Sequence, residues 1–222
     1  MTLFLGTWQI MDSERIPCMT YFGSMTKKDD ENESEGVEII GRWGDLGCAK
    51  GAMICRAKSY EKVANWIYNW VPMANCKIKP ICDDNTAREI ILGRKPDYQV
   101  NYSYVNDEPT DGEILYMINY KFHLNKKMEG YNAFALLSEE EDKKDAGNCR
   151  CLGRWHDIGT GSGMAIAIAK NEGDIYSWAY HWTGMCECEI TPVLTDNQSR
   201  KIIKSKPDYQ KKLNKVLKII NE

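Results

Sequence analysis

Arg154, His156 and Asp157 place a guanidinium, an imidazole and a carboxylate close together in the second half of the chain. The run that contains them is typical of a short β-strand. Because side chains alternate between the two faces of a sheet, Arg154 and His156 share one face, and Trp155 points from the other into the expected core. Histidine exchanges a proton near neutral pH, and the planar fork of arginine can hold a carboxylate or an enolate oxygen. The pattern indicates a site for acid/base chemistry on an organic anion.

Two other expected strands bring polar side chains to the same predicted cavity. Around residues 186–191, Glu189 and Thr191 lie opposite an apolar set that should meet the helices, so they are expected to point between two sheets. Asn119 in an earlier strand is expected to point the same way. We therefore predict one cavity in which Asn119, Thr191 and Arg154 contact the substrate beside His156 and Glu189.

The predicted roles follow from the chemistry of each side chain. His156 is the expected catalytic acid/base, while Glu189 and Asp157 orient the imidazole or act as base. Arg154 holds the anionic group of the substrate. An alternative is open, in which Arg154 and Glu189 form an interior ion pair and His156 caps a strand end. In both cases a charge between sheets must be paired or solvated.

The strand with Arg154 occurs twice in the chain. The segment GRWGDLG at 41–47 recurs as GRWHDIG at 153–159, at an offset of 153 − 41 = 112. The same offset carries the tryptophan-rich segment 66–70 onto 178–182. Matches of this density in one register predict a tandem duplication, and two copies suggest a pseudo-dimer.

The first copy differs from the second at the reactive positions. Gly44 stands where the second copy has His156, and Lys77 and Lys79 stand where it has glutamate and threonine. With Arg42, the first copy therefore has a basic inward set that lacks a histidine. We expect the second copy to keep a reactive site and the first to supply anion-binding charge across the seam between them. Neutral drift in a copy that lost its site is the alternative.

Each copy is predicted to have the order β-α-β-β-α-β, which is that of a ferredoxin-like unit. The expected strands and second helices cover 3–10, 37–43, 52–57, 60–70 and 76–82 in the first copy, and 115–122, 151–155, 164–169, 174–182 and 188–194 in the second. The predicted organisation is a repeat at 1–100, a linker at 101–112 and a repeat at 113–222. The expected fold class is α+β, with two ferredoxin-like sheets packed face to face as an intramolecular dimeric α/β barrel.

The composition bounds the class of protein. The chain has 222 residues, of which 43% are hydrophobic, and this composition is typical of a globular protein. Its net charge of −3 argues against a protein that binds nucleic acid. It contains no apolar run of about 20 residues and no signal-peptide pattern, so a cytoplasmic location is expected, without membrane attachment. A mature form whose targeting segment was removed is the alternative. No cofactor is expected for the predicted acid/base chemistry. The Gly-rich turn at 159–163 is not a phosphate loop, because no helix follows it. The acidic runs at 29–35 and 139–142 are interpreted as solvated loops.

Nine cysteines cannot all pair, and free thiols are expected in such a chain. Cys149 and Cys151 form one Cys-x-Cys pair, and Cys186 and Cys188 another. Four thiolates can bind zinc or an iron–sulfur cluster. However, these pairs are expected on opposite edges of one sheet, so no metal site is predicted.

At these residues the chain resembles a bacterial domain-of-unknown-function family with a Gly-Arg-Trp-His signature. The second copy carries that signature at 153–156 and a Thr-Pro-Val-Leu-x-Asp ending at 191–196, whereas the first copy keeps Thr7-Trp8 but departs at Gly44 and at 79–82. The resemblance covers most of both copies and implies small dimeric α/β-barrel domains of the ferredoxin-like group. That fold group includes cofactor-free monooxygenases, isomerases, lyases and stress-related binding proteins, so the fold does not choose an activity.

Two functions remain open from the sequence. The first is a protein with a polar pocket that binds a small anionic organic molecule and transforms it by cofactor-free acid/base chemistry, as an isomerase, lyase or monooxygenase would. The second is a non-catalytic interaction or stress-response module with an ion-paired interior. In either case the protein is expected to be a monomeric pseudo-dimer or a homodimer.

Overall fold

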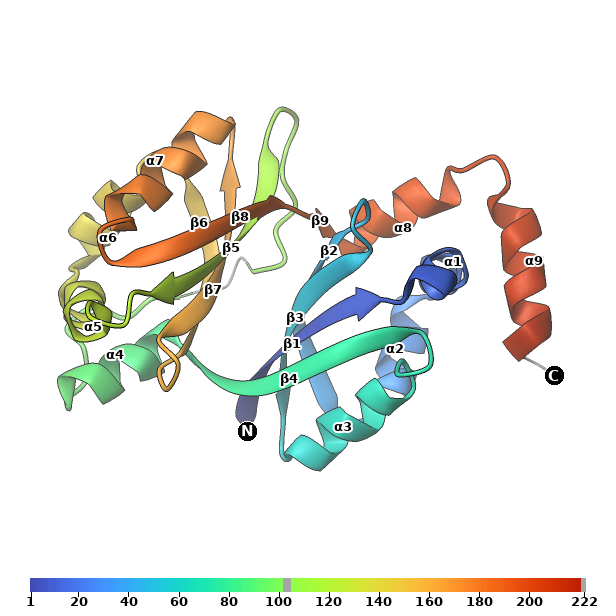
Figure 1. The fold of residues 1–222 in the computed structure, drawn as a ribbon, viewed down its shortest axis with the longest axis horizontal. Helices are drawn as coiled ribbons and strands as arrows, with labels where there is room; N and C mark the ends of the chain where they lie inside the picture. Colours follow the sequence, from blue (N-terminus) through green and yellow to red (C-terminus); the bar gives the residue numbers. More distant parts are fainter. Residues whose placement is uncertain (102–104, 221–222) are drawn as a thin grey trace. The chain divides into compact units, whose positions relative to one another are not determined.

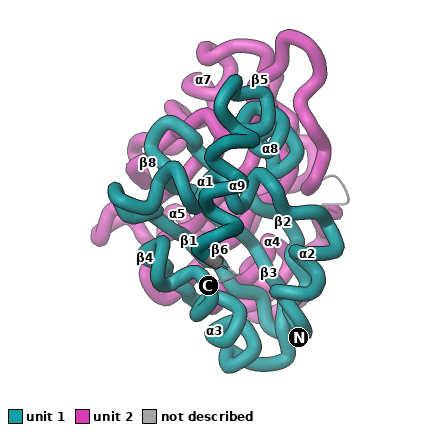
Figure 2. The backbone as a smooth tube through the Cα atoms, turned by 90° about the vertical axis from the view of Figure 1, so that its right-hand side faces the viewer, with its two compact units in different colours: residues 1–79, 194–222 teal, residues 80–193 magenta. Residues whose placement is uncertain are grey.

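The two repeats exchange their C-terminal segments. In the computed structural model, which describes residues 1–101 and 105–220, one compact unit comprises residues 1–79 and 194–222, and the other comprises residues 80–193 (Figure 2). The boundary falls inside strand β4 (Ala74–Asp83), so the end of β4 and helix α4 (Asp84–Leu92) belong to the second unit. The predicted linker at 101–112 lies partly outside the described residues.

The second unit is a ferredoxin-like fold (Figure 1). Its antiparallel sheet has the order β8-β5-β7-β6, with the end of β4 added beside β6. Its remaining elements are β5 (Ile114–Phe122), α5 (Lys127–Leu136), α6 (Glu139–Ala146), β6 (Arg150–Asp157), β7 (Ser162–Ala169), α7 (Glu172–Trp182) and β8 (Cys186–Pro192).

The first unit repeats this arrangement, with the sheet order β4-β1-β3-β2 and β9 added beside β2. Its other elements are β1 (Thr2–Ile10), η1 (Asp12–Glu14), α1 (Arg15–Ser24), α2 (Lys27–Glu33), β2 (Val37–Asp45), β3 (Lys50–Ala57), α3 (Tyr60–Tyr68), β9 (Leu194–Thr195), α8 (Asp196–Lys204) and α9 (Tyr209–Ile220). The predicted β-α-β-β-α-β order is confirmed in both units. The face-to-face packing of the two sheets stays a prediction.

The glycine of each Gly-Arg-Trp segment makes room for the tryptophan that follows it. Trp43 and Trp155 are buried, with exposures of 2% and 4%, as their position opposite the arginine predicted. A Cβ atom added at Gly41 or Gly153 would enter the indole ring two residues further along the same strand. Because residues i and i+2 share a face, the ring can fold back over the strand only where the earlier residue has no side chain.

The acidic runs form helices, which corrects their interpretation as loops. Thr26 and Ser138 close capping boxes at the starts of α2 and α6, where carboxylates also favour the positive end of the helix dipole. One aspartate of each helix, Asp30 or Asp142, turns inward, and its side chain is only 13% exposed. No helix in the described residues has the length and apolar character that spanning a membrane requires.

Candidate functional site

A row of side chains crosses the sheet of the second unit. In the antiparallel register, Cys188 of β8 lies opposite Tyr120 of β5, Tyr120 opposite Gly163 of β7, and Gly163 opposite His156 of β6. Directly opposed residues point to the same face of a sheet. The phenol of Tyr120, the imidazole of His156 and the thiol of Cys188 therefore share a face.

Gly163 allows two of these side chains to meet. Tyr120 and His156 are separated by strand β7, yet the phenol oxygen lies 2.5 Å from Nδ1 of the imidazole. A Cβ atom at position 163 would collide with the ring and hydroxyl of Tyr120 and with the carbonyl oxygen of Trp155. The tyrosine ring thus lies over the backbone of the glycine.

The other nitrogen of the imidazole contacts a buried carboxylate. Nε2 of His156 lies 2.5 Å from Oδ1 of Asp84, the first residue of α4, which is fully buried. The same carboxylate accepts hydrogen bonds from Nε and Nη2 of Arg154 at 2.7–3.1 Å. Tyr120, His156 and Asp84 form a continuous hydrogen-bonded chain.

Arg154 belongs to a balanced group of two guanidinium and two carboxylate groups. Its Nη1 and Nη2 donate to Asp142 at 3.1 and 2.9 Å. Arg88, also fully buried, lies 3.6 Å from Asp142 and donates to the main-chain carbonyls of 135 and 137. The ring of Phe134 packs against both guanidinium groups, with centroid distances of 4.6 and 5.1 Å. Such pairing is what burial of charge requires.

The protonation states follow from these contacts. Burial alone would raise the pKa of Asp84, but the Arg154 guanidinium and the His156 hydrogen bond outweigh it, so this pKa lies well below the usual range. Burial, together with the positive charges of Arg154 and Arg88, lowers the pKa of His156 by more than its contact with Asp84 raises it. Burial also raises the pKa of Tyr120 well above its ordinary value. At neutral pH the chain therefore consists of a neutral phenol, a neutral imidazole and a carboxylate.

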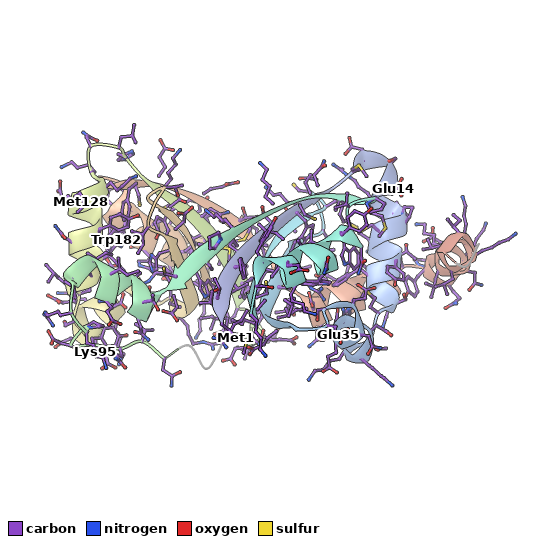
Figure 3. All side chains as sticks on the ribbon, turned by 90° about the horizontal axis from the view of Figure 1, so that it is seen from below. Met1, Glu14, Glu35, Lys95, Met128 and Trp182 are labelled. Carbon is purple, nitrogen blue, oxygen red and sulfur yellow. The ribbon has the colours of Figure 1, made fainter. Side chains whose placement is uncertain are left out.

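A cavity of about 70 Å³ lies beside this chain, between the sheet and helices α5 and α7. Its sheet wall includes Ile118, Ala165 and the side chains of the Tyr120–His156 row. On the helix side, Trp178 and Trp182 line it, and Figure 3 labels the second of these. Both indole N–H groups donate to Asp145, at 2.9 and 2.7 Å. The wall is mostly apolar, with acid/base groups on one side.

Two thiols line the same cavity. The sulfur atoms of Cys186 and Cys188 are 3.7 Å apart and share a hydrogen bond. That bond and burial raise the pKa of Cys186, whereas the bond lowers the pKa of Cys188. Cys151 lies on β6, which strands β5 and β7 separate from β8, the strand that carries this pair. Among the described residues, no group of three or more histidine, cysteine or acidic side chains is arranged to hold a metal ion.

The first unit contains the equivalent charged group without the histidine. Arg42 donates to Asp196 at 2.6–3.0 Å and to Asp30 at 2.8 Å, and Arg200 contacts Asp30. Each of these residues lies 112 positions from its counterpart, with 196 − 84 = 112 and 142 − 30 = 112. Gly44 occupies the position of the imidazole.

The structure brings Arg154 and His156 together as predicted, but it separates them from three other predicted site residues. Glu189 and Asn119 lie in the row of Met164 and Trp155, on the opposite face of the sheet. Thr191, two residues beyond Glu189 on β8, shares that face, and Glu189 is exposed. The expected common cavity is therefore wrong. The alternation of side chains along a strand predicted which residues share a face. It did not predict that Arg154 and His156 face the helices, where their carboxylate partners lie.

The remaining predicted residues lie elsewhere. Asp157 accepts a hydrogen bond from the main-chain N–H of Thr160, so it shapes the β6–β7 turn. Arg42 is bound by two carboxylates of its own unit. Lys77 is exposed, and both Lys77 and Lys79 belong to the first unit. Their anion-binding role stays a prediction.

Sequence reasoning missed Asp84, Tyr120 and Asp142. The duplication carried a signal for two of them, because Asp84 matches Asp196 and Asp142 matches Asp30 at the offset of 112. No local signal marked Tyr120, because it reaches His156 only through the register of three strands.

The chain was compared with known proteins. A family model described as a domain of unknown function (DUF3303) matches residues 2–94 and 114–207. The comparison with curated proteins found no match. Among solved structures, the chain is similar to a chlorite dismutase candidate, with 8% identity, a TM-score of 0.48, and coverage of 90% of this chain and 98% of that one.

Two further solved structures have similar values. A monooxygenase candidate from Lactobacillus acidophilus NCFM has 10% identity, a TM-score of 0.46, and coverage of 88% of this chain and 95% of that one. A dye-decolorizing peroxidase from Bacteroides thetaiotaomicron VPI-5482 has 10% identity, a TM-score of 0.46, and coverage of 90% and 94%.

Proposed function

Both repeats of the chain belong to the family described as a domain of unknown function (DUF3303), and we propose its function from the site alone. The residues at the cavity of the second unit transfer a proton from one atom to another of a small, weakly acidic carbonyl compound. The observation that carries this proposal is the hydrogen-bonded chain from Tyr120 through His156 to Asp84, which begins at the cavity wall. Isomerisation through an enol or enolate is the reaction class that such a chain serves.

The chain supplies a route for one proton. Asp84 is ionised and accepts the Nε2–H of His156, which leaves Nδ1 to accept the hydroxyl proton of Tyr120. The phenol oxygen takes a proton from the carbon next to the substrate carbonyl while its own proton passes to Nδ1. Asp84 stabilises the imidazolium that forms. Reversal of the transfer to another atom of the substrate completes the isomerisation and restores all three groups.

The ligand that fits the cavity is uncharged when it enters. Its walls are mostly apolar, and the charge of Arg154 is balanced by Asp84 and Asp142. This modifies the expectation of an anion held by Arg154, because negative charge would develop on the substrate only as the proton leaves. A cytoplasmic location and the monomeric or homodimeric state stay predictions.

The size of the cavity limits the substrate. At about 70 Å³ it is smaller than the engineered cavity of roughly 150 Å³ that holds benzene in another protein. Small ketones such as acetone and butanone are therefore suitable probes. Their α-protons exchange slowly with D₂O, and NMR measures the exchange directly.

The test compares α-proton exchange in wild type, Tyr120→Phe and His156→Gln. Wild type is expected to accelerate the exchange, and each variant to lose about 100-fold or more of that acceleration. The matched control is Tyr131→Phe, which removes a buried phenol that donates to the carbonyl of Ile158, and it is expected to keep the activity. The proposal fails if Tyr120→Phe exchanges as fast as wild type, or if wild type accelerates neither ketone.

A second candidate is the non-catalytic module with an ion-paired interior. It is favoured by the recurrence of the balanced arginine–aspartate group in the first unit, which has no histidine. The arginine–aspartate group can therefore have a purely structural role, without the histidine. If wild type leaves ketone exchange unchanged while His156→Gln only alters stability, the second candidate gains support.

A further inference from the structure

The first unit has its own cavity, of about 100 Å³, between its sheet and helices α1 and α3. It occupies the position equivalent to the cavity of the second unit, since Trp66 and Trp70 correspond to Trp178 and Trp182 at the offset of 112. Its walls are aromatic and sulfur-containing: Trp8, Met19, Phe22, Met53, Trp66 and Trp70. Such walls suit a flat, polarisable ligand.

The two cavities differ in the groups that could transfer a proton. Trp8 replaces Tyr120, and its ring lies over Gly51 as the tyrosine ring lies over Gly163. Gly44 replaces His156. The first cavity therefore lacks both members of the proton-transfer pair, although it keeps the wall that holds the ligand.

One hydroxyl group takes the place of the lost imidazole. Ser199 of α8 is 3% exposed, and its Oγ lies 3.8 Å from the position that a Cβ atom of Gly44 would occupy. Its counterpart in the second unit is Ala87, since 199 − 87 = 112. Within residues 1–101 and 105–220, no hydrogen bond to the Ser199 hydroxyl is formed. A buried hydroxyl in this state gains free energy from a ligand that bonds to it.

The charged side chains that line the cavity are of both signs, so they do not select an ion; they are Arg42, Asp45, Lys50, Lys77 and Asp196. Arg42 is held by Asp30 and Asp196 at 2.6–3.0 Å, which balances its charge. Lys77 alternates with Cys76 and Ile78 along β4, and it is exposed. Burying an unpaired ligand charge against the apolar wall would be costly.

We propose that the cavity of the first unit is a second ligand site, which binds an uncharged single-ring molecule through its indole and thioether walls and one hydrogen bond to Ser199. The protein would then hold a reactive cavity in one unit and a binding cavity in the other. This site does not depend on proton transfer in the second unit, so either proposal can fail alone.

At about 100 Å³ the cavity is smaller than the roughly 150 Å³ that holds benzene in another protein, so a five-membered ring is the suitable size. Pyrrole and thiophene form a pair of probes, because both are flat five-membered rings and only pyrrole has an N–H group that can donate to the Ser199 hydroxyl. Binding is measured by NMR titration of the indole N–H signals and by the shift in Tm at millimolar ligand. Wild type is expected to bind both, and pyrrole more tightly. Ser199→Ala is expected to weaken pyrrole binding about 3- to 10-fold, as loss of one hydrogen bond does, and to leave thiophene binding unchanged.

Filling the cavity provides an independent test. A Cβ atom at Gly44 meets only the oxygen of Ser199, at an ordinary contact distance, so Gly44→Ala is expected to fold and to weaken both probes. Gly44→Val places more volume in the cavity and is expected to abolish binding. His156→Gln, which alters only the cavity of the second unit, is the control and is expected to bind both probes normally. The proposal is overturned if wild type binds neither probe, if Gly44→Val binds both as wild type does, or if Ser199→Ala weakens both equally.

Discussion

Tyr120 reaches His156 across an intervening strand, with its phenol oxygen 2.5 Å from Nδ1 of the imidazole. The contact exists because the residue between them in the row is Gly163. A polar chain that runs across the strands in this way is fixed by the register of three strands. Its geometry is therefore as rigid as the sheet, which is the condition for directed proton transfer.

Replacement of Gly163 by alanine is expected to break that contact. The added Cβ would overlap the Tyr120 ring and the Trp155 carbonyl, so the tyrosine must move away from the histidine. We expect a loss of about 1–3 kcal/mol in the free energy of unfolding and a fall in ketone exchange to the level of Tyr120→Phe. Urea unfolding and deuterium exchange measure the two effects. Gly159→Ala is the matched control, because its nearest neighbour lies 3.6 Å away, and equal effects of both substitutions would contradict the role of Gly163.

The stability of the protein is expected to fall as the pH decreases through about 6.5. Burial lowers the pKa of His156 in the folded state, so the unfolded chain takes up a proton at this residue first, and protonation favours unfolding. The pKa of Asp84 is also lowered by folding, which adds a further loss below about pH 4. Urea unfolding at several pH values is expected to show a shallower fall between pH 7 and 5 for His156→Gln. His181→Gln, at a half-exposed position, should follow wild type, and an unchanged slope in His156→Gln would argue against the assignment.

Asp84→Asn is expected to destabilise the protein more than Asp196→Asn. Asp84 is fully buried and binds both Arg154 and His156, whereas the equivalent Asp196 binds Arg42 and has a side chain that is 29% exposed. Loss of a buried partner costs about 3–5 kcal/mol, and we expect less than half of that at Asp196. Thermal and urea unfolding compare the two variants. Only Asp84→Asn should also abolish ketone exchange, so loss of activity in both would indicate that the two units do not act separately.

The proton-transfer pair is expected to be transferable to the first unit. In a His156→Gln background, the substitutions Trp8→Tyr, Gly44→His and Ser199→Ala copy the second unit, and Asp196 already occupies the position of its carboxylate. We expect ketone exchange at least about tenfold above the background. The rate is measured by NMR, with Trp8→Tyr alone as the control. A fully folded variant without activity would show that the tyrosine, histidine and aspartate at these positions are not sufficient for proton transfer.

Much of the fold followed from local patterns. The first strand, predicted at 3–10, is found at Thr2–Ile10, and its counterpart predicted at 115–122 is found at Ile114–Phe122. These boundaries were accessible because alternation and the duplication are both local in sequence. The helices at 27–33 and 139–146 could not be predicted in this way, because their seven or eight mostly charged residues show no apolar periodicity. These helices depend on their capping boxes.

The sequence by itself determined that the chain is a duplication, that each copy has a β-α-β-β-α-β order, and that Arg154 and His156 share a face. Only the tertiary structure decided which face that is. Asp84 stands 70 positions from Arg154 in sequence and reaches it because the end of the first repeat folds into the second unit. Alternation along a strand gives relative orientation, whereas burial of a charge depends on the partners that another segment brings to it.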